Sequence, residues 1–546
     1  MRTPRGPRIT RLSIRDNLLS LFSFAPATAE LHRETAISYL RQFLDDPRVC
    51  ANSSLEALTE EITSVSNETQ AIPVSNYLSF LKQTIIAEST NMSSPRCIGH
   101  MTSIVPGFLW ILGELMIGLN QNVVKRDASR ALTILERQAL AMLHKCVYGL
   151  NDEFYKIYAQ RENTALGILT SGATISNITA LWMARNICFG HAEGRLGAEI
   201  EGLVASNYDF RQRRTVIIAS TFAHYSIQKA AGLLGIGERN VIAIPVDRHG
   251  RMKLSALQRA VEECSERGDR IVAIVATAGT TDCGSIDPLR DIARLAHSAG
   301  VHLHVDAAWG SPLLFSQRLR GKLEGIEAAD SVTVDAHKQL YLPLGHSVLL
   351  LRDPSACRVI EKQSRYMLQE CSGDLGKRSF EGSRPGSALL LHAALKIIGC
   401  DGYAFLIEDN IRKARTMSSM LTAMDEFELL IRPATNIVLY RYIAPWLRGA
   451  ARNGSLSAAD NLFLNELNEE IQRAQSESGR AFVSKTTICN TDHGSPVVAL
   501  RAVLANPFTT GQDIEFVLRD QVELGERLES RATELSRAAV QTHYGD

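Results

Sequence analysis

The sequence predicts an α/β fold, with a mainly parallel sheet in a large domain and a smaller α+β domain toward the C-terminus. From about residue 166, short runs rich in valine and isoleucine alternate with helical patterns, which is typical of parallel strands covered by helices on both faces. Beyond about residue 402 the pattern becomes helix, strand, helix, strand. We therefore expect an N-terminal helical segment over 1–95, a large domain over 96–401 and a small domain over 402–546.

The N-terminal segment is predicted to be helical because apolar residues recur on one face, as they do over 30–44. Its first 22 residues carry five spaced arginines before a leucine-rich run. We interpret this stretch as an amphipathic helix, with a targeting peptide as the alternative. A loop of small polar residues over 94–103 follows, and then a long helical region that ends near Tyr148.

The large domain contains a series of short strands whose ends carry polar residues. The predicted strands are 215–220, 241–246, 271–277, 302–305, 331–334 and 347–351. Thr277, Asp306 and Lys338 lie at or just beyond the carboxyl ends of three of them. Parallel sheets bind ligands at that edge, so we expect the functional site there.

Composition excludes several classes of function. Lys+Arg and Asp+Glu are both 59 among 546 residues, so nothing points to nucleic acid or an anionic membrane surface. The longest apolar run, 104–119, contains Pro106 and Glu114 and is too short to span a bilayer. The ten cysteines show no metal-binding spacing, which favours reduced thiols in a cytoplasmic protein and no metal.

Lys338 is the residue around which the chemistry is predicted. It follows the strand 331–334 and stands beside His337. A charged, unpaired lysine is costly just past a buried strand, whereas a desolvated lysine is suited to forming a Schiff base. Pyridoxal 5′-phosphate uses such a bond as its anchor and also needs an acid for its ring nitrogen. A surface lysine that extends its ammonium into water is the alternative.

Two stretches before the lysine could hold a flat, phosphorylated ring. The turn over 169–177, with Ala173 and Thr174, combines small and hydroxylated residues at the start of a helix. Its exposed backbone N–H groups suit a phosphate, although any capped helix looks similar. His224 follows the strand 215–220 and could stack on the ring or be a buried core histidine.

Two further strand ends complete the predicted site. The carboxylate of Asp306 is costly at a buried strand end unless it pairs with a cation, and a protonated pyridine nitrogen is such a cation. Ala308 leaves room for a flat ring. The hydroxyl of Thr277 could reach the cofactor or the substrate, or cap the next helix. These features follow one another on successive strand ends, which makes coincidence improbable.

The segments 223–224, 304–308 and 337–338 resemble the group II pyridoxal-phosphate-dependent amino-acid decarboxylases, which have the aspartate aminotransferase fold (fold type I). The similarity extends from about residue 95 to the C-terminus. The motifs 99–103, 381–386 and 482–484 resemble those of bacterial aspartate 1-decarboxylases. Arg501 stands where glutamate decarboxylases keep an arginine for the substrate carboxylate.

The resemblance implies a role for each candidate residue. Lys338 would bind the cofactor covalently, Asp306 would pair with its ring nitrogen and His224 would stack over the ring. The remaining cofactor contacts would come from Ala173, Thr174, Thr277, Ala308, Ser331 and His337. The substrate would be held by Arg501, Arg384, His100 and Ser103. Family members are homodimers whose active sites are completed by the partner subunit.

The predicted reaction is α-decarboxylation of a small acidic amino acid, with L-aspartate giving β-alanine and CO₂. L-Glutamate giving GABA is the alternative, and cysteine sulfinate or an aromatic amino acid would be further ones. A pyridoxal-phosphate-binding regulator without catalysis is the rival from another class, but 1–95 contains no evident basic recognition helix. Many relatives carry a catalytic tyrosine on a mobile loop. In the corresponding segment 366–384 of this chain the only tyrosine is Tyr366.

Overall fold

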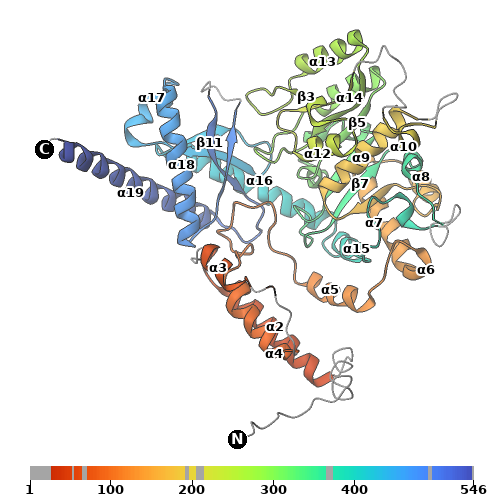
Figure 1. Cartoon of the computed structure of the whole chain (residues 1–546), viewed down its shortest axis with the longest axis horizontal. Helices are drawn as coiled ribbons and strands as arrows, with labels where there is room; N and C mark the ends of the chain where they lie inside the picture. The colour runs from red at the N-terminus through yellow and green to blue at the C-terminus, as the bar shows by residue number, and fades with distance from the viewer. Residues whose placement is uncertain are drawn as a thin grey trace, which may run out of the picture.

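The protein is described from a computed structural model over residues 26–51, 55–63, 65, 71–190, 196–203, 214–364, 373–489 and 495–543, with side chains from 29 to 529. The predicted amphipathic helix of the first 22 residues and Tyr366 lie outside these residues. Figure 1 shows a large body that contains one sheet, a smaller body beside it and two helical extensions.

The large body is built on a seven-stranded sheet. In spatial order its strands are β1 (Gly167–Thr170), β7 (Ser347–Leu351), β6 (Ser331–Asp335), β5 (His302–Asp306), β4 (Arg270–Thr277), β2 (Thr215–Ser220) and β3 (Val241–Ile244). The five strands from β6 to β3 pair in parallel, whereas β7 is antiparallel to both β6 and β1. The sheet is therefore mainly parallel, as the strand pattern predicts.

Helices cover both faces of this sheet because successive strand residues point to opposite sides. Ile274 of β4 packs in the core cluster that includes α7 (Ala131–Tyr148), α13 (Leu254–Arg267) and α14 (Leu289–Ser298). Its neighbour Val275 packs in the cluster that includes α9 (Ala173–Cys188) and α12 (Ser226–Leu233). The carboxyl ends of β4, β5 and β6 lie together at one edge between these layers, because Thr277 of β4 pairs with Asp306 of β5.

The small body is an antiparallel sheet backed by long helices. Its strands lie in the order β10 (Ser484–Ile488), β11 (Val497–Val503), β9 (Ile437–Tyr442) and β8 (Phe427–Ile431). The helices α18 (Ala458–Ser478) and α19 (Gly511–His543) pack with β9 and β11 in a second core. In Figure 1 the far end of α19 projects away from both bodies.

Helix α16 (Gly399–Ala423) joins the two bodies. Tyr403 and Ile407 are buried in the core of the large body, and Met417 and Leu421 are buried in the core of the small one. The predicted domain boundary at residues 401 and 402 therefore falls in the first turn of a helix that serves both cores.

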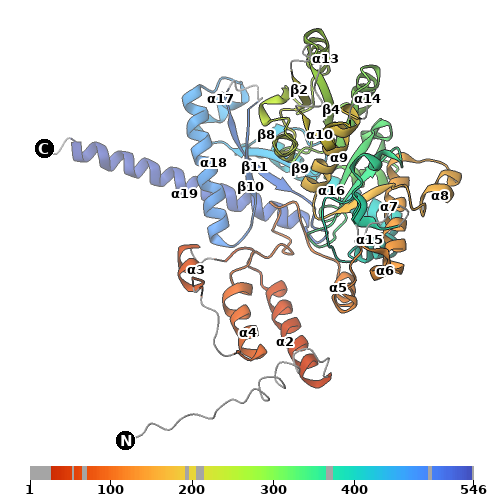
Figure 2. The ribbon, with the colours of Figure 1, turned by 45° about the vertical axis from the view of Figure 1, so that its right-hand side comes forward.

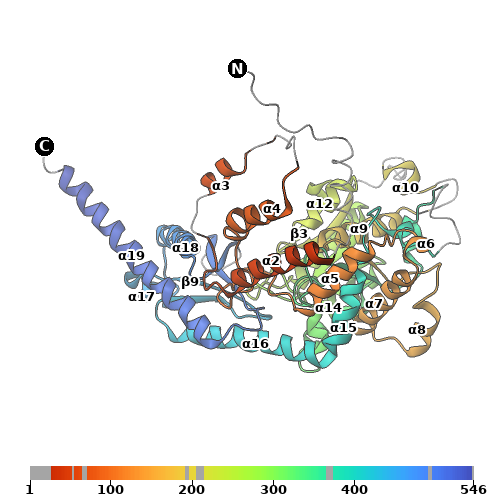
Figure 3. The same cartoon turned by 90° about the horizontal axis from the view of Figure 1, so that it is seen from below.

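The N-terminal segment forms an arm of helices. It contains α2 (Pro26–Asp45), α3 (Leu55–Glu61), α4 (Val74–Phe80) and a π-helical turn (Leu81–Ile86). Figures 2 and 3 show α2 and α4 side by side and extended away from the sheet of the large body. Exposed apolar side chains remain along this arm, among them Leu31, Tyr77 and Phe80.

The other helices complete the large body and the edge of the small one. They are α5 (Phe108–Leu119), α6 (Arg126–Ser129), α8 (Asp152–Tyr158), α10 (Ala198–Glu201), α15 (Ala388–Ile397) and α17 (Arg448–Arg452). Within the described ranges, no single helix is both long and apolar enough to cross a membrane. Together, α15 and α16 would meet that criterion only as a pair bent by 86°.

Candidate active site

Lys338 lies in the tight turn that follows β6. Its Nζ is 3.4 Å from Oδ2 of Asp335, the last residue of the strand. Burial raises the pKa of Asp335, and the nearby charge of Lys338 opposes that rise. The turn continues into Tyr341, which adopts a positive φ of 61°, a costly conformation for a tyrosine. The Tyr341 hydroxyl compensates by donating to Ala505 O and accepting from Asn410, so the backbone after the lysine is held in place.

His337 fills the space on the other side of Asp335. Its Nδ1 approaches Asp335 Oδ1 at 3.0 Å, but its hydrogen bond goes to the carbonyl of His346 at 3.1 Å. Burial lowers the pKa of His337, so the ring is neutral near pH 7. Asp335 Oδ1 consequently remains buried without a hydrogen-bond partner among the described residues.

Asp306 ends β5 and has only neutral hydrogen-bond donors in the described part of the chain. Its Oδ2 accepts from Asn177 Nδ2 at 2.9 Å, and its Oδ1 accepts from the backbone N–H of Ala308 at 3.1 Å. The side chain is buried, and a buried carboxylate is strongly stabilised by a cation at such a place. The structure thus leaves this negative charge ready to pair with a cationic ligand atom.

Asn177, on the first turns of α9, connects the catalytic candidates. Its Nδ2 donates to both Asp306 and the hydroxyl of Ser226, at 2.9 Å each. Its Oδ1 accepts from Thr333 at 2.7 Å and lies 3.0 Å from His304 Nε2. All four hydrogen-bonding positions of this amide are therefore used, which fixes its orientation. The sequence analysis did not single out Asn177 as a site residue.

His224 is oriented by the same network. Its Nδ1 accepts from the backbone N–H of Ser226 at 3.3 Å and lies 2.9 Å from the Ser226 hydroxyl. Because Asn177 donates to that hydroxyl, the hydroxyl proton points to His224. Burial lowers the pKa of His224, and the charge of Asp306 opposes this effect. The histidine is therefore a neutral, oriented ring close to Asp306, as a stacking role requires.

Ser331 lies behind the site rather than at its edge. It begins β6, and its hydroxyl is 2.9 Å from both His302 Nε2 and His304 Nδ1. His304 in turn contacts Asn177, and burial lowers the pKa of His304 to about 4. Among the described residues, Ser331 thus reaches Asp306 through His304 and Asn177, which differs from the direct cofactor contact implied by the family resemblance.

The other predicted cofactor residues line the carboxyl edge. Ala173 and Thr174 begin α9, where backbone N–H groups have no acceptor within the helix and can bind an anion. The hydroxyl of Thr277 is buried beside Asp306 and has no hydrogen-bond partner in the described ranges. Ala308 is buried and presents only a methyl group. These observations match the needs of pyridoxal phosphate: a lysine, an acid, phosphate donors and a flat space.

Arg501 on β11 faces this edge from the small body. Its Nε donates to the carbonyl of Thr281 at 2.8 Å, in the turn after β4, and its Nη1 donates to Ser484 Oγ at 2.9 Å. Its Nη2 is buried and has no hydrogen-bond partner among the described residues. Burial lowers the pKa of Arg501, but an arginine remains charged. One donor of a buried cation is therefore left for a ligand.

The loop over 99–103 brings His100 between the two bodies. It can do so because Gly99 packs directly on β10, where an added Cβ would lie 2.4 Å from the backbone nitrogen of Ser484. Burial lowers the pKa of His100, and the charges of Arg501 and Lys338 lower it further. His100 is thus near both residues. In the same loop, Ser103 Oγ is buried with no hydrogen-bond partner in the described part of the chain.

Asp282 is a second residue that the sequence analysis did not single out. It accepts a hydrogen bond from Thr486 of β10 at 2.6 Å. Burial lowers the pKa values of Arg501 and His224, and the negative charge of Asp282 opposes this effect at both residues. The site therefore contains one acid close to the predicted substrate arginine. The sequence feature that could have identified Asp282 is its position two residues after Thr280, in the turn that follows β4.

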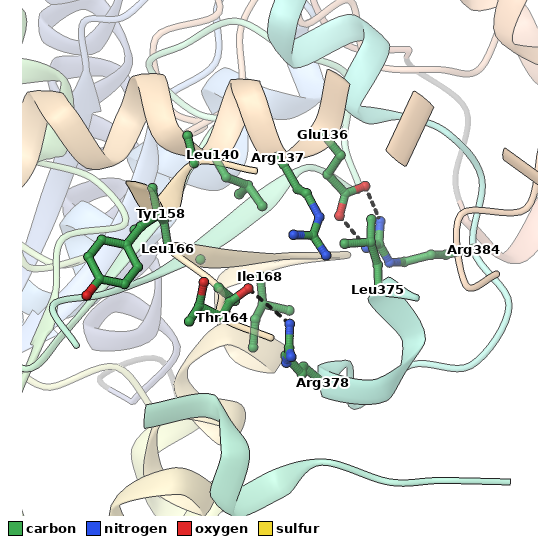
Figure 4. Close-up of a pocket in the computed structure, with 13 residues that line it drawn as sticks. Glu136, Arg137, Leu140, Tyr158, Thr164, Leu166, Ile168, Leu375, Arg378 and Arg384 are labelled. Atoms are coloured by element: carbon green, nitrogen blue, oxygen red, sulfur yellow. Dashed lines mark hydrogen bonds and ion pairs between the residues drawn. The ribbon is translucent and has the colours of Figure 1, made fainter. Parts of the chain in front are cut away.

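Arg384 lies apart from this group. Its Nη1 donates to Glu136 Oε2 at 2.7 Å and its Nη2 pairs with the other oxygen of the same carboxylate. Figure 4 shows this ion pair at the edge of a cavity lined by α7, β1 and the segment before α15. Apart from Arg384, none of the predicted site residues lines that cavity.

Comparisons with known proteins agree with this geometry. The protein-family model described as "Pyridoxal-dependent decarboxylase conserved domain" matches residues 59–443 of this chain. The chain is 38% identical to the aspartate 1-decarboxylase of Aliivibrio fischeri over 93% of its length and 94% of that protein. It is 31% identical to the L-2,4-diaminobutyrate decarboxylase of Rhizobium meliloti over 77% of its length and 76% of that protein.

A solved structure confirms the predicted fold class. The crystal structure of mouse CSAD superposes with a TM-score of 0.80 at 25% identity and covers 92% of this chain and 99% of that one. The conserved-domain match includes the lysine turn, Asp306, His224 and the first turn of α9. The chain belongs to the pyridoxal-dependent decarboxylases and is a carboxy-lyase that acts on an amino acid with pyridoxal phosphate as its cofactor.

Proposed function

We propose that the protein decarboxylates L-aspartate to β-alanine and CO₂, with L-glutamate as the weaker substrate. The observation that carries this proposal is Arg501, a buried arginine with one unused donor at the edge of the site. A guanidinium binds a carboxylate through two parallel hydrogen bonds, so Arg501 suits the side-chain carboxylate of an acidic substrate. The similarity to an aspartate 1-decarboxylase along nearly the whole chain supports the same choice.

The residues around the cofactor site divide the work of the reaction. Bound pyridoxal phosphate supplies an acceptor for the electron pair that remains when CO₂ leaves. Asp306 would keep a proton on the ring nitrogen, because its charge is buried and held by neutral donors. His224 would contact the ring as a neutral imidazole. Ala173 and Thr174 would bind the phosphate through backbone N–H groups at the start of α9.

Lys338 and Asp335 are placed to handle protons. Lys338 Nζ lies 3.4 Å from the Asp335 carboxylate, which would hold the lysine nearby as an ammonium whenever it is not bonded to the cofactor. The net reaction replaces the α-carboxylate by a proton at Cα. The proton donor in the segment 366–384 stays a prediction, since Tyr366 lies outside the described residues.

A homodimer with shared active sites is part of the proposal. The apolar helix α5 (Phe108–Leu119) leaves Ile111, Leu115 and Ile117 largely exposed, Ile117 at 73%. Leu344, six residues after Lys338, is also exposed. Apolar patches of this kind mark interaction surfaces, and the closeness of Leu344 to the lysine turn in sequence fits an interface at the active site. The nine described cysteines are all free, which favours the cytoplasm.

A panel of amino acids tests the proposed substrate. Purified protein with pyridoxal phosphate would be assayed for amine product and CO₂ with L-aspartate, L-glutamate, cysteine sulfinate, L-2,4-diaminobutyrate and an aromatic amino acid. We expect the highest kcat/KM for L-aspartate and no activity for Lys338→Ala. The two acids differ by one methylene, which is worth about 1–3 kcal/mol in a fitted pocket. A preference for glutamate would reverse the ranking, and activity on aromatic amino acids alone would remove the role of Arg501.

A further inference from the structure

A second, small cavity lies in the large body and is lined by arginines (Figure 4). It has a volume of about 30 Å³. Arg137 of α7, Arg378 of the 3₁₀ turn Leu375–Arg378 and Arg384 reach it from three segments, and Gly167 and Ile168 of β1 close one side. Figure 4 shows the Arg137 guanidinium between the Arg384–Glu136 pair and Arg378.

The three arginines leave several donors unused. Within the described part of the chain, Arg137 donates only to main-chain carbonyls, those of Arg161 at 2.8 Å and Gly373 at 3.2 Å. Arg378 donates to Glu361 and to the carbonyls of Glu162 and Thr164. The Nε of Arg384 is buried with no hydrogen-bond partner in the described ranges. Such a buried donor costs about 1–3 kcal/mol unless a ligand or water satisfies it.

The arginines of this cavity differ in their ion pairs. Arg384 pairs with Glu136 and Arg378 with Glu361. Arg137 has no carboxylate within ion-pair distance among the described residues, and it is 8% exposed. Its pKa is lowered by burial and then by the charge of Arg378, while the more distant charges of Glu162 and Glu136 oppose this effect. Arg137 is therefore the cation of this cavity that lacks a direct partner of opposite charge in the described part of the chain.

We propose that this cavity binds one small monovalent inorganic anion, of the class of chloride, against Arg137, Arg378 and Arg384. A single negative charge would neutralise Arg137, whose burial is otherwise costly. The volume admits one ion or one to two water molecules and excludes an organic acid. The site is separate from the cofactor residues, and the proposal holds whichever amino acid is the substrate.

Anion binding would join the segment 373–386 to the rest of the large body. Arg378 and Arg384 belong to that segment, whereas Arg137 belongs to α7 and already holds the carbonyl of Gly373. The bound anion would link these elements through charge-assisted hydrogen bonds, which are stronger than those between neutral groups. We therefore expect a halide to stabilise the folded protein.

Bromide is the probe that locates the site. Crystals of the holoenzyme grown in sodium gluconate would be soaked in sodium bromide, and anomalous differences would be measured at the bromine edge. We expect a peak within hydrogen-bonding distance of the Arg137 guanidinium. Density from ordered water alone, with no anomalous peak in the cavity, would overturn the proposal.

Thermal stability supplies a second measurement. At equal ionic strength, replacing gluconate by chloride should raise the melting temperature by about 1–3 °C with a saturable dependence on concentration. Arg137→Gln should abolish this increment. Arg259→Gln on α13 changes an exposed arginine without a described partner and should retain it. An equal increment in the Arg137 variant would contradict the site. If that variant does not fold, the bromide map of the parent protein still decides.

Discussion

Arg501 and Arg384 are both buried arginines, and sequence reasoning assigned both to the substrate, but their surroundings differ. Arg384 faces the Glu136 carboxylate with two nitrogens. Burial lowers its pKa, but the Glu136 charge outweighs this and the pKa is raised. Arg501 is held by a carbonyl and a hydroxyl, and one of its nitrogens has no hydrogen-bond partner among the described residues. The comparison teaches that an arginine paired with its own carboxylate serves the fold, whereas one held by neutral acceptors keeps its charge for a ligand.

The same distinction separates the acids. Asp306 is held by an amide and a backbone N–H, both neutral, and it lies at the edge where the ligand is expected. Glu136 is used by Arg384. Buried charges without an ion-pair partner among the described residues are therefore available to a ligand, and the predictions below test this rule at single residues of the active site.

The largest effect is expected for Asp306→Asn. The substitution keeps the shape but removes the charge, so the ring nitrogen loses the partner that keeps it protonated. Electrostatic contributions of this kind are worth about 10²–10³ in rate, and kcat should fall by that amount while the visible absorption of bound cofactor remains. Asp330→Asn is the matched control, because Asp330 caps the opposite end of the strands by accepting from Leu303 N. A rate within about twofold of the parent for Asp306→Asn would remove Asp306 from the mechanism.

The second effect compares the two arginines directly. Arg501→Lys should lower kcat/KM for both L-aspartate and L-glutamate by about tenfold or more, because an ammonium cannot make the paired hydrogen bonds and each is worth roughly 1.5–3 kcal/mol. Arg384→Lys should leave kcat/KM nearly unchanged and lower the melting temperature.

The reverse result would break the comparison. If Arg384→Lys selectively weakened acidic substrates while Arg501→Lys did not, Arg384 would be the substrate arginine, and the Glu136 pair would have to open when substrate binds. Steady-state kinetics with both acids, together with thermal unfolding of both variants, separate the two outcomes.

The smallest effect is expected for Asp282→Asn. Removing the acid near Arg501 should raise kcat/KM for L-aspartate by about two- to fivefold, the size of one partly exposed charge interaction. It should lower any activity on L-2,4-diaminobutyrate, whose side chain is a cation. Competition assays with the two substrates measure the ratio. A fall in aspartate activity alone would show that Asp282 positions Arg501 rather than opposing the substrate.

The sequence predicted the local features of the site well. Lys338, Asp306, Thr277 and His224 end or follow strands whose observed bounds agree with the predicted ones to within about one residue, as 302–305 against His302–Asp306 shows. These predictions worked because a buried strand and the polar residue at its end are neighbours in the chain. The helix start at Ala173 was found for the same reason.

The parts that sequence reasoning missed depend on contacts between distant residues. Asn177 lies 129 positions from Asp306, and Glu136 lies 248 positions from Arg384. No local pattern announces such partners. Ser331 shows the same limit, because its position in β6 fits a polar contact but only the sheet register shows that the contact is His304. Helix periodicity also did not show that α16 continues across the predicted boundary at residues 401 and 402 and packs into both cores.

Helix α16 has a consequence for how the protein unfolds. The same helix packs Tyr403 and Ile407 into one core and Met417 and Leu421 into the other. If either core melts, part of α16 loses its packing, and the broken helix exposes apolar surface to water on both sides of the break. The two bodies are therefore expected to lose structure together in one cooperative transition. Cutting the chain at the predicted boundary would leave Tyr403 and Ile407 on the C-terminal half, so a separately expressed large half would lack the part of the helix that completes its core.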